Sequence, residues 1–151
     1  MTINLSPLFH IEIVVHDAEA SYQFLHKVFG AQKVEEHIPA YLEEILPGTK
    51  CIHVSVGGVV LQLVQPTEQL TSWYKQLKEK GPGVHNLTFL VDDLDAAVEF
   101  LKSEGAPVIF SIELEKSRIF GSDAKGSLQV PMIDTMDKIG FRIELAETPV
   151  K

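Results

Sequence analysis

Seven side chains that could bind a metal ion or move a proton lie in four largely apolar segments of the chain. They are His10, Glu12, Gln62, Asn86, Thr88, Arg142 and Glu144. Imidazole, carboxylate and amide groups are ligands for divalent cations, and histidine and glutamate also serve as general acids and bases. These residue types indicate a small polar site that acts on, or binds, a small molecule.

The four segments show the alternation of β-strands that have one apolar face. Apolar side chains occupy every second position of segments 9–15, 60–64, 86–91 and 141–146, and the polar side chains fall between them. Successive side chains of a strand point to opposite faces, so the polar set should share the face away from the helices. If the strands belong to one curved sheet, this set lines a concave cup. The competing interpretation is that the face is the solvated side of an antiparallel sheet.

The chain contains two copies of one unit. Residues 84–107 match residues 8–31 at an offset of 76, so that Asn86 falls on His10. Each copy has the pattern of a strand, an acidic turn and an amphipathic helix, and three further strands can follow each helix. The sequence therefore predicts an α+β fold of two tandem βαβββ modules, which form a curved mixed sheet with the helices outside.

The repeat also predicts the boundaries of the modules and the ends of their helices. We expect a single domain over 1–151, with module one at about 8–66, a linking helix at about 67–80 and module two at about 84–147. Asp17 and Asp93 are the predicted helix N-caps. The predicted core includes side chains from both helices, namely Tyr22, Phe24, Leu25, Val98, Phe100 and Leu101.

Composition excludes several classes of function. The net charge of −8, from 21 acidic and 13 basic residues, argues against a nucleic-acid partner, because phosphate binding needs a basic surface. Cys51 is the single cysteine, so an internal disulfide is excluded and a reducing compartment is favoured. The start of the chain has no basic region before its apolar run, and no apolar stretch is long enough to span a bilayer. We therefore expect a cytoplasmic protein that does not bind membranes.

Four stretches of the sequence carry a resemblance to a known family. They are "FHIEIVV" and "GVHNLTFLVDD", which begin the two modules, and "LQLVQP" and "GFRIEL", which end them. Together with the repeat they resemble the vicinal oxygen chelate superfamily of glyoxalases, epimerases, dioxygenases and metal-free bleomycin-resistance proteins. The resemblance covers about 8–147 and is strongest to the methylmalonyl-CoA epimerases and glyoxalases. It implies a homodimer, because members with one pair of modules commonly associate.

The resemblance also implies a set of metal ligands. In this family each module contributes one ligand from its first strand and one from its last, which here correspond to His10, Gln62 and Glu144, with Asn86 where a second histidine is expected. An amide is a weaker ligand for transition metals than imidazole, so the resemblance implies a weakly bound divalent metal or none. Alternation turns the neighbouring His85 to the other side of its strand, which favours a structural role.

Two kinds of function follow from this site. One is a lyase or isomerase that stabilises an enolate of a small carbonyl or thioester substrate on the metal, with Glu144 as ligand and catalytic base. The alternative is a metal-free protein that binds a small molecule without chemistry. The candidate substrate-binding residues are Glu12, Asn86, Thr88 and Arg142. For Arg142 an ion pair with Glu12 or Glu144 is an equally weighted interpretation.

Overall fold

The computed structural model of the chain describes residues 2–34, 43, 46–67, 71–120 and 122–148. It consists of two compact units, which we call the first unit and the second unit. The first unit is His10–His85, and the second combines Met1–Phe9 with Asn86–Lys151. The N-terminal segment therefore belongs to the second unit, and the boundary between the units falls between His85 and Asn86.

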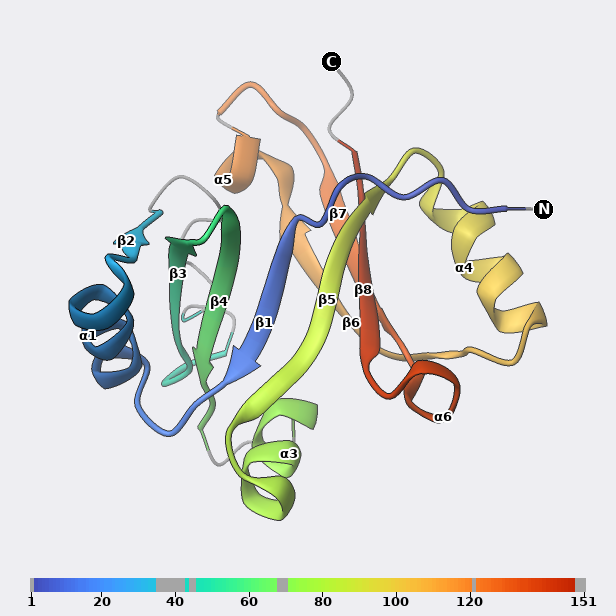
Figure 1. Ribbon diagram of the computed structural model, residues 1–151. Coiled ribbons are helices and arrows are strands. Elements are labelled where there is room, and N and C mark those ends of the chain that lie inside the picture. The colour runs from blue at the N-terminus through green and yellow to red at the C-terminus, as the bar shows by residue number, and fades with distance from the viewer. Residues whose placement is uncertain (1, 35–42, 44–45, 68–70, 121, 149–151) are drawn as a thin grey trace. The chain divides into compact units, whose positions relative to one another are not determined.

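The first unit is a four-stranded mixed sheet with a helix against one face (Figure 1). Its elements are β1 (His10–Val14), α1 (Ala18–Phe29), β2 (Gln32–Lys33), β3 (Lys50–Val56), β4 (Val59–Gln65) and α3 (Ser72–Lys80). The strand order is β2-β3-β4-β1, in which β4 is parallel to β1 and the other neighbours are antiparallel. The first and last strands of the module are therefore adjacent, which brings their side chains together.

The second unit repeats this topology. Its elements are β5 (Gly83–Val91), α4 (Leu94–Ser103), β6 (Val108–Glu115), α5 (Lys116–Phe120), β7 (Ser127–Ile133), α6 (Met136–Ile139) and β8 (Arg142–Glu147). The strand order is β5-β8-β7-β6, with β5 parallel to β8, and the boundary between the units falls inside β5. The predicted α+β class and the tandem βαβββ modules are confirmed.

The two long module helices begin at equivalent aspartates. The Asp17 carboxylate accepts a hydrogen bond of 2.9 Å from the amide of Ala20, and that of Asp93 accepts one of 3.0 Å from Ala96. Each cap satisfies an amide that would otherwise lack a partner in the first helical turn. The predicted N-caps are confirmed, and they fix the point where each chain segment leaves its first strand and turns to cover the sheet.

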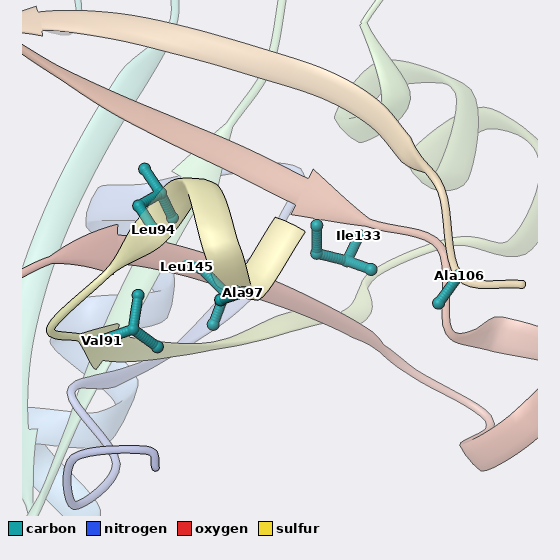
Figure 2. Packing of buried hydrophobic residues seen from close by; sticks show 6 residues of the cluster. All are labelled: Val91, Leu94, Ala97, Ala106, Ile133 and Leu145. Atoms are coloured by element: carbon teal, nitrogen blue, oxygen red, sulfur yellow. The ribbon is translucent and has the colours of Figure 1, made fainter. Parts of the chain in front are cut away.

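Each unit has its own apolar core between helix and sheet. In the first unit the buried residues are Val15, Ala18, Ala31, Val54 and Leu63, with Tyr22 and Leu25 packed against them. In the second unit they are Val91, Leu94, Ala97, Ala106, Ile133 and Leu145, with Val98 and Leu101 packed against them (Figure 2). These cores occupy the helix side of each sheet, so the polar side chains between them are left on the opposite face.

The prediction that Phe24 contributes to the core is wrong. Its side chain is 60% exposed. The stripe of α1 that faces the sheet contains Ala18, Tyr22 and Leu25, and a residue one position before Leu25 is turned about 100° away from it. Phe24 instead contacts Phe29 on the outside of the helix, with ring centroids 6.1 Å apart.

The predicted linking helix is present but begins later than expected. Thr71 caps α3 by accepting a hydrogen bond from the Tyr74 amide at 3.2 Å, so the helix covers Ser72–Lys80. Leu70, which we expected on its apolar stripe, lies outside the described residues. Trp73 is buried on this stripe. Within the ranges given above, the helices lack the combination of length and apolar character that crossing a bilayer requires.

Candidate functional site

Three strands of the first unit place polar side chains in one row. His53 on β3 is the register partner of Gln62 on β4, and Gln62 is in turn the partner of Glu12 on β1. Register partners in neighbouring strands point to the same face, and His10 shares that face because it lies two positions before Glu12. All four side chains are buried. The first unit therefore brings the predicted His10, Glu12 and Gln62 onto one face, together with a histidine that we did not predict.

Glu12 is enclosed by two protein donors. The indole Nε1 of Trp73 donates a hydrogen bond to Glu12 Oε1, and His85 Nδ1 lies 2.9 Å from the same oxygen. The Trp73 and His85 rings also contact each other edge to face, with centroids 6.3 Å apart. His85 thus has a partner inside the protein, but that partner belongs to the polar row, contrary to the expectation that alternation turns His85 away from this set. The contacts of Glu12 account for a buried carboxylate without a substrate, so the role of Glu12 in substrate binding stays a prediction.

Gln62 presents a buried oxygen. Its Nε2 donates to Cys51 Sγ at 3.3 Å, whereas its Oε1 is buried and has no hydrogen-bond partner among the residues that the structure describes. Leaving a buried acceptor unsatisfied costs about 1–3 kcal/mol. A cation or a ligand donor beside Oε1 would remove this cost, so Gln62 fits its expected role as a ligand.

His53 is the site residue that sequence reasoning missed. Its ring centroid lies 5.7 Å from that of His10, with 57° between the ring planes. The signal was present in segment 50–56, where Cys51 and His53 alternate with the apolar Ile52 and Val54. This is the same period of two that identified His10 and Glu12.

Four polar residues of the second unit form a block on two adjacent parallel strands. In the register of β5 and β8, Asn86 is paired with Arg142 and Thr88 with Glu144. Thr88 Oγ1 lies 2.9 Å from Glu144 Oε1 and 3.1 Å from Asn86 Oδ1. Asn86, Thr88 and Glu144 are buried and Arg142 is half-buried. The structure thus brings together all four predicted site residues of this module.

The Thr88 hydroxyl links an amide to a carboxylate. A hydroxyl carries one hydrogen, so Asn86 Oδ1 and Glu144 Oε1 compete for the single Thr88 hydrogen when the Asn86 oxygen faces Thr88. Rotating the Asn86 amide by 180° directs its Nδ2 to Thr88 and leaves the hydroxyl hydrogen to Glu144 alone. In either arrangement Thr88 fixes the direction of one Glu144 oxygen.

Arg142 forms no ion pair within the part of the chain that the structure describes. The alternative interpretation of an ion pair with Glu144, two positions along the same strand, is therefore not supported. The Arg142 Nε is buried and also lacks a hydrogen-bond partner among the described residues. A guanidinium is permanently charged and prefers a planar anion that accepts two hydrogen bonds. The role of Arg142 in substrate binding stays a prediction.

Amide oxygens are needed for a metal site in this protein. In the described ranges, no three His, Cys, Asp or Glu side chains form a group that could hold a metal ion. Gln62 offers an amide oxygen beside the two imidazoles of the first unit, and Asn86 offers one beside Glu144 in the second. The donors fit a divalent ion only if an amide is counted among them.

A protein-family model matches most of the chain. The model of the Glyoxalase/Bleomycin resistance protein/Dioxygenase superfamily matches residues 9–120. The chain belongs to this superfamily. The matched region contains the strands that carry His10, His53, Gln62, Asn86 and Thr88, and it ends before β8.

Relatives within this superfamily include mitochondrial methylmalonyl-CoA epimerases. The human protein is 31% identical over 125 residues, which cover 71% of this chain and 66% of that protein. The mouse protein is 31% identical over 124 residues, covering 70% and 65%. The matches therefore span just under two thirds of these curated relatives.

Solved structures of the superfamily share the fold. Methylmalonyl-CoA epimerase from Mycobacterium tuberculosis has a TM-score of 0.71 at 24% identity and covers 99% of this chain and 93% of its own. A Streptomyces coelicolor methylmalonyl-CoA epimerase variant in complex with 2-nitronate-propionyl-CoA has a TM-score of 0.70 at 22% identity, covering 97% and 100%. At these identities the likeness is one of fold.

Proposed function

We propose that the protein is an isomerase that epimerises an acyl thioester of the methylmalonyl-CoA type by removing and returning the proton next to the thioester carbonyl. The observation that carries the proposal is the block of Thr88, Glu144 and Arg142 on β5 and β8, in which Arg142 has no ion-pair partner among the described residues. The similarity to methylmalonyl-CoA epimerases supports the same reaction class. The substrate is a small molecule, and we keep the expected homodimer as part of the proposal.

Glu144 is the proposed base. Its carboxylate removes the proton, the C–H electron pair moves into the enolate, and Glu144 holds the proton as a carboxylic acid. Thr88 directs Oε1 by its hydrogen bond, so that the carboxylate does not need to be ordered by the substrate. Return of a proton to the opposite face of the enolate requires a second acid. Glu43 is exposed, and Glu44 lies outside the described residues.

Arg142 is the proposed carboxylate-binding residue. A methylmalonyl thioester carries a carboxylate on the carbon that loses its proton, so the carboxylate and that C–H group must be recognised side by side. Arg142 and Glu144 are two positions apart on β8, a separation of about 6.6 Å along one face of a strand. A guanidinium can bind a carboxylate through two parallel hydrogen bonds, which would orient the adjacent C–H group.

A divalent metal fits this chemistry as a cofactor. His10 and Gln62 are its proposed donors on the first unit. The buried, unsatisfied Gln62 Oε1 supports this assignment. When bound, such an ion would polarise the thioester carbonyl and so stabilise the enolate.

Deuterium exchange tests the proposal without requiring a coupled assay. The protein should exchange the proton next to the thioester carbonyl of methylmalonyl-CoA in deuterated water, as followed by NMR or mass spectrometry. Glu144→Gln should slow this exchange by about 10²-fold or more, because it removes the base but keeps the shape. Glu147→Gln is the matched control, since Glu147 lies on the same strand and is partly exposed, and it should leave the rate unchanged.

Two outcomes would contradict the proposal. If Glu144→Gln leaves the exchange rate unchanged, Glu144 is not the catalytic base. Binding of acyl-CoA thioesters without any exchange would favour the alternative of a small-molecule binding protein that performs no chemistry.

A further inference from the structure

We propose that His53 provides the second imidazole of a divalent-metal site that the first unit builds from His10, His53 and Gln62. The resemblance to glyoxalases and epimerases implied this imidazole at position 86, where the chain has asparagine. His53 lies on a different strand, in the middle of β3, and shares a face with both other donors. With His10 and His53 the site would have two imidazole ligands and would not need a ligand at position 86.

The separation of the two imidazoles fits one shared ion. A metal-bound imidazole nitrogen lies about 2.0–2.1 Å from zinc, which puts the ring centre about 3.2 Å from the ion. Two rings on one ion therefore have centres about 4.5 Å apart at a right angle and about 6.4 Å apart when opposite. The centroids of His10 and His53 are 5.7 Å apart, within this range, and both Nε2 atoms are buried.

Gln62 supplies the third donor. Its main chain is the cross-strand partner of His53, so the two side chains are neighbours on one face of the sheet. The hydrogen bond from Nε2 to Cys51 Sγ occupies the nitrogen side of the amide and leaves Oε1 as the buried acceptor without a partner among the described residues. Gln62 is only 5% exposed, so bulk water does not compensate for this oxygen.

The chemistry of this donor set favours zinc, nickel or cobalt over magnesium. Two imidazoles and one neutral amide oxygen supply borderline-soft nitrogen ligands, which magnesium binds poorly. Three protein ligands also leave coordination positions open for a substrate or water, as in catalytic zinc sites. Glu12 is not needed as a ligand, because Trp73 and His85 already hold its Oε1.

The inference deepens the proposed function, because it names residues that hold the proposed metal, but its test does not use the reaction. The tag-free protein, stripped with a chelator, is titrated calorimetrically with Zn²⁺ and Ni²⁺, and its Co²⁺ absorption spectrum is recorded. We expect His53→Ala to weaken Zn²⁺ binding at least tenfold and to change the Co²⁺ spectrum. His16→Ala is the control, because His16 is an exposed histidine of the same unit, and it should change neither.

A second variant keeps the test decisive if His53→Ala fails to fold. His53→Asn replaces the ring with a smaller polar group and should weaken Zn²⁺ binding in the same direction. The inference is overturned if the wild type binds no transition metal, or if His53→Ala and His53→Asn bind Zn²⁺ as the wild type does. It is also overturned if Asn86→His raises Zn²⁺ affinity tenfold while His53→Ala changes nothing. If the His53 variants bind Zn²⁺ as the wild type does and still catalyse proton exchange, the proposed function stands and His53 is not a metal ligand.

Discussion

The Thr88 hydroxyl donates a hydrogen bond of 2.9 Å to Glu144 Oε1, although the two residues are 56 positions apart in the sequence. The parallel pairing of β5 and β8 makes them register partners. The N-terminal segment of the chain also forms hydrogen bonds with the backbone of β5. The Phe9 amide donates to the Thr88 carbonyl at 2.9 Å, and Ser6 Oγ accepts from the Leu90 amide at the same distance. The position of Glu144 is therefore set by backbone pairing as well as by one side-chain contact.

Removing the Thr88 hydroxyl should impair the proposed proton transfer. Thr88→Val keeps the shape of the side chain but leaves Glu144 Oε1 without this donor, so we expect exchange to slow by about tenfold, the equivalent of about 1.4 kcal/mol. Thr88→Ser retains the hydroxyl and should retain most of the rate. Equal rates in both variants, measured by deuterium exchange with methylmalonyl-CoA, would mean that the hydroxyl does not orient the base.

Replacing Arg142 should affect substrates according to their charge. Arg142→Gln removes the cation that is proposed to bind the substrate carboxylate, and we expect affinity for methylmalonyl-CoA to fall at least tenfold, a loss of about 1.4 kcal/mol or more. Propionyl-CoA lacks that carboxylate and should bind both proteins alike. Calorimetric titration with the two thioesters measures the difference. A similar loss of affinity for both thioesters would mean that Arg142 binds the coenzyme part of the ligand or is needed for folding.

Removing the indole hydrogen bond to Glu12 should destabilise the first unit. Trp73→Phe retains an aromatic ring in the buried position but removes the Nε1 donor, which should lower the free energy of unfolding by about 1–3 kcal/mol. Tyr74→Phe, at the next and less buried position of α3, is the control and should change it by less than about 0.5 kcal/mol. Urea denaturation followed by circular dichroism gives both values. Comparable losses in the two variants would assign the effect to the helix and not to Glu12.

The sequence allowed prediction of features that depend on local patterns. Alternation placed Asn86, Thr88 and Glu144 on one face, and the acidic turns located the caps at Asp17 and Asp93. These features follow from the period of a strand and the chemistry of a helix end, which a short window of residues contains.

Contacts between distant segments could not be predicted in the same way. Trp73 and Glu12 are 61 positions apart, and their hydrogen bond depends on how the linking helix packs against β1. The row of His53, Gln62 and Glu12 depends on the register of three strands, which alternation alone does not specify. His53 is visible in the period of two of segment 50–56, but its position beside Gln62 depends on the register of β3 and β4.

Gln62 offers a test in which stability and binding should change independently. Its Oε1 is buried without a hydrogen-bond partner among the described residues, and its Nε2 donates to the sulfur of Cys51. Gln62→Leu replaces the amide with an apolar side chain of similar size, so it removes a buried acceptor that the metal-free protein does not satisfy. We expect the free energy of unfolding of the chelator-treated protein to stay the same or to rise by about 0.5–2 kcal/mol. Zn²⁺ affinity should nevertheless fall at least tenfold, because the variant has no oxygen to offer a metal.

Urea denaturation and zinc titration of the same preparations give the two quantities, and Gln65→Leu is the matched control. Gln65 lies on the same strand three positions later, where its Oε1 accepts a hydrogen bond of 3.0 Å from the Ala18 amide. Its replacement should destabilise the protein by about 1 kcal/mol, because the amide of Ala18 loses its acceptor, and should leave Zn²⁺ affinity unchanged. A large loss of stability in Gln62→Leu with no change in zinc binding would reverse the assignment. Gln62 would then contribute to the packing of the sheet, and its Oε1 would not be a metal ligand.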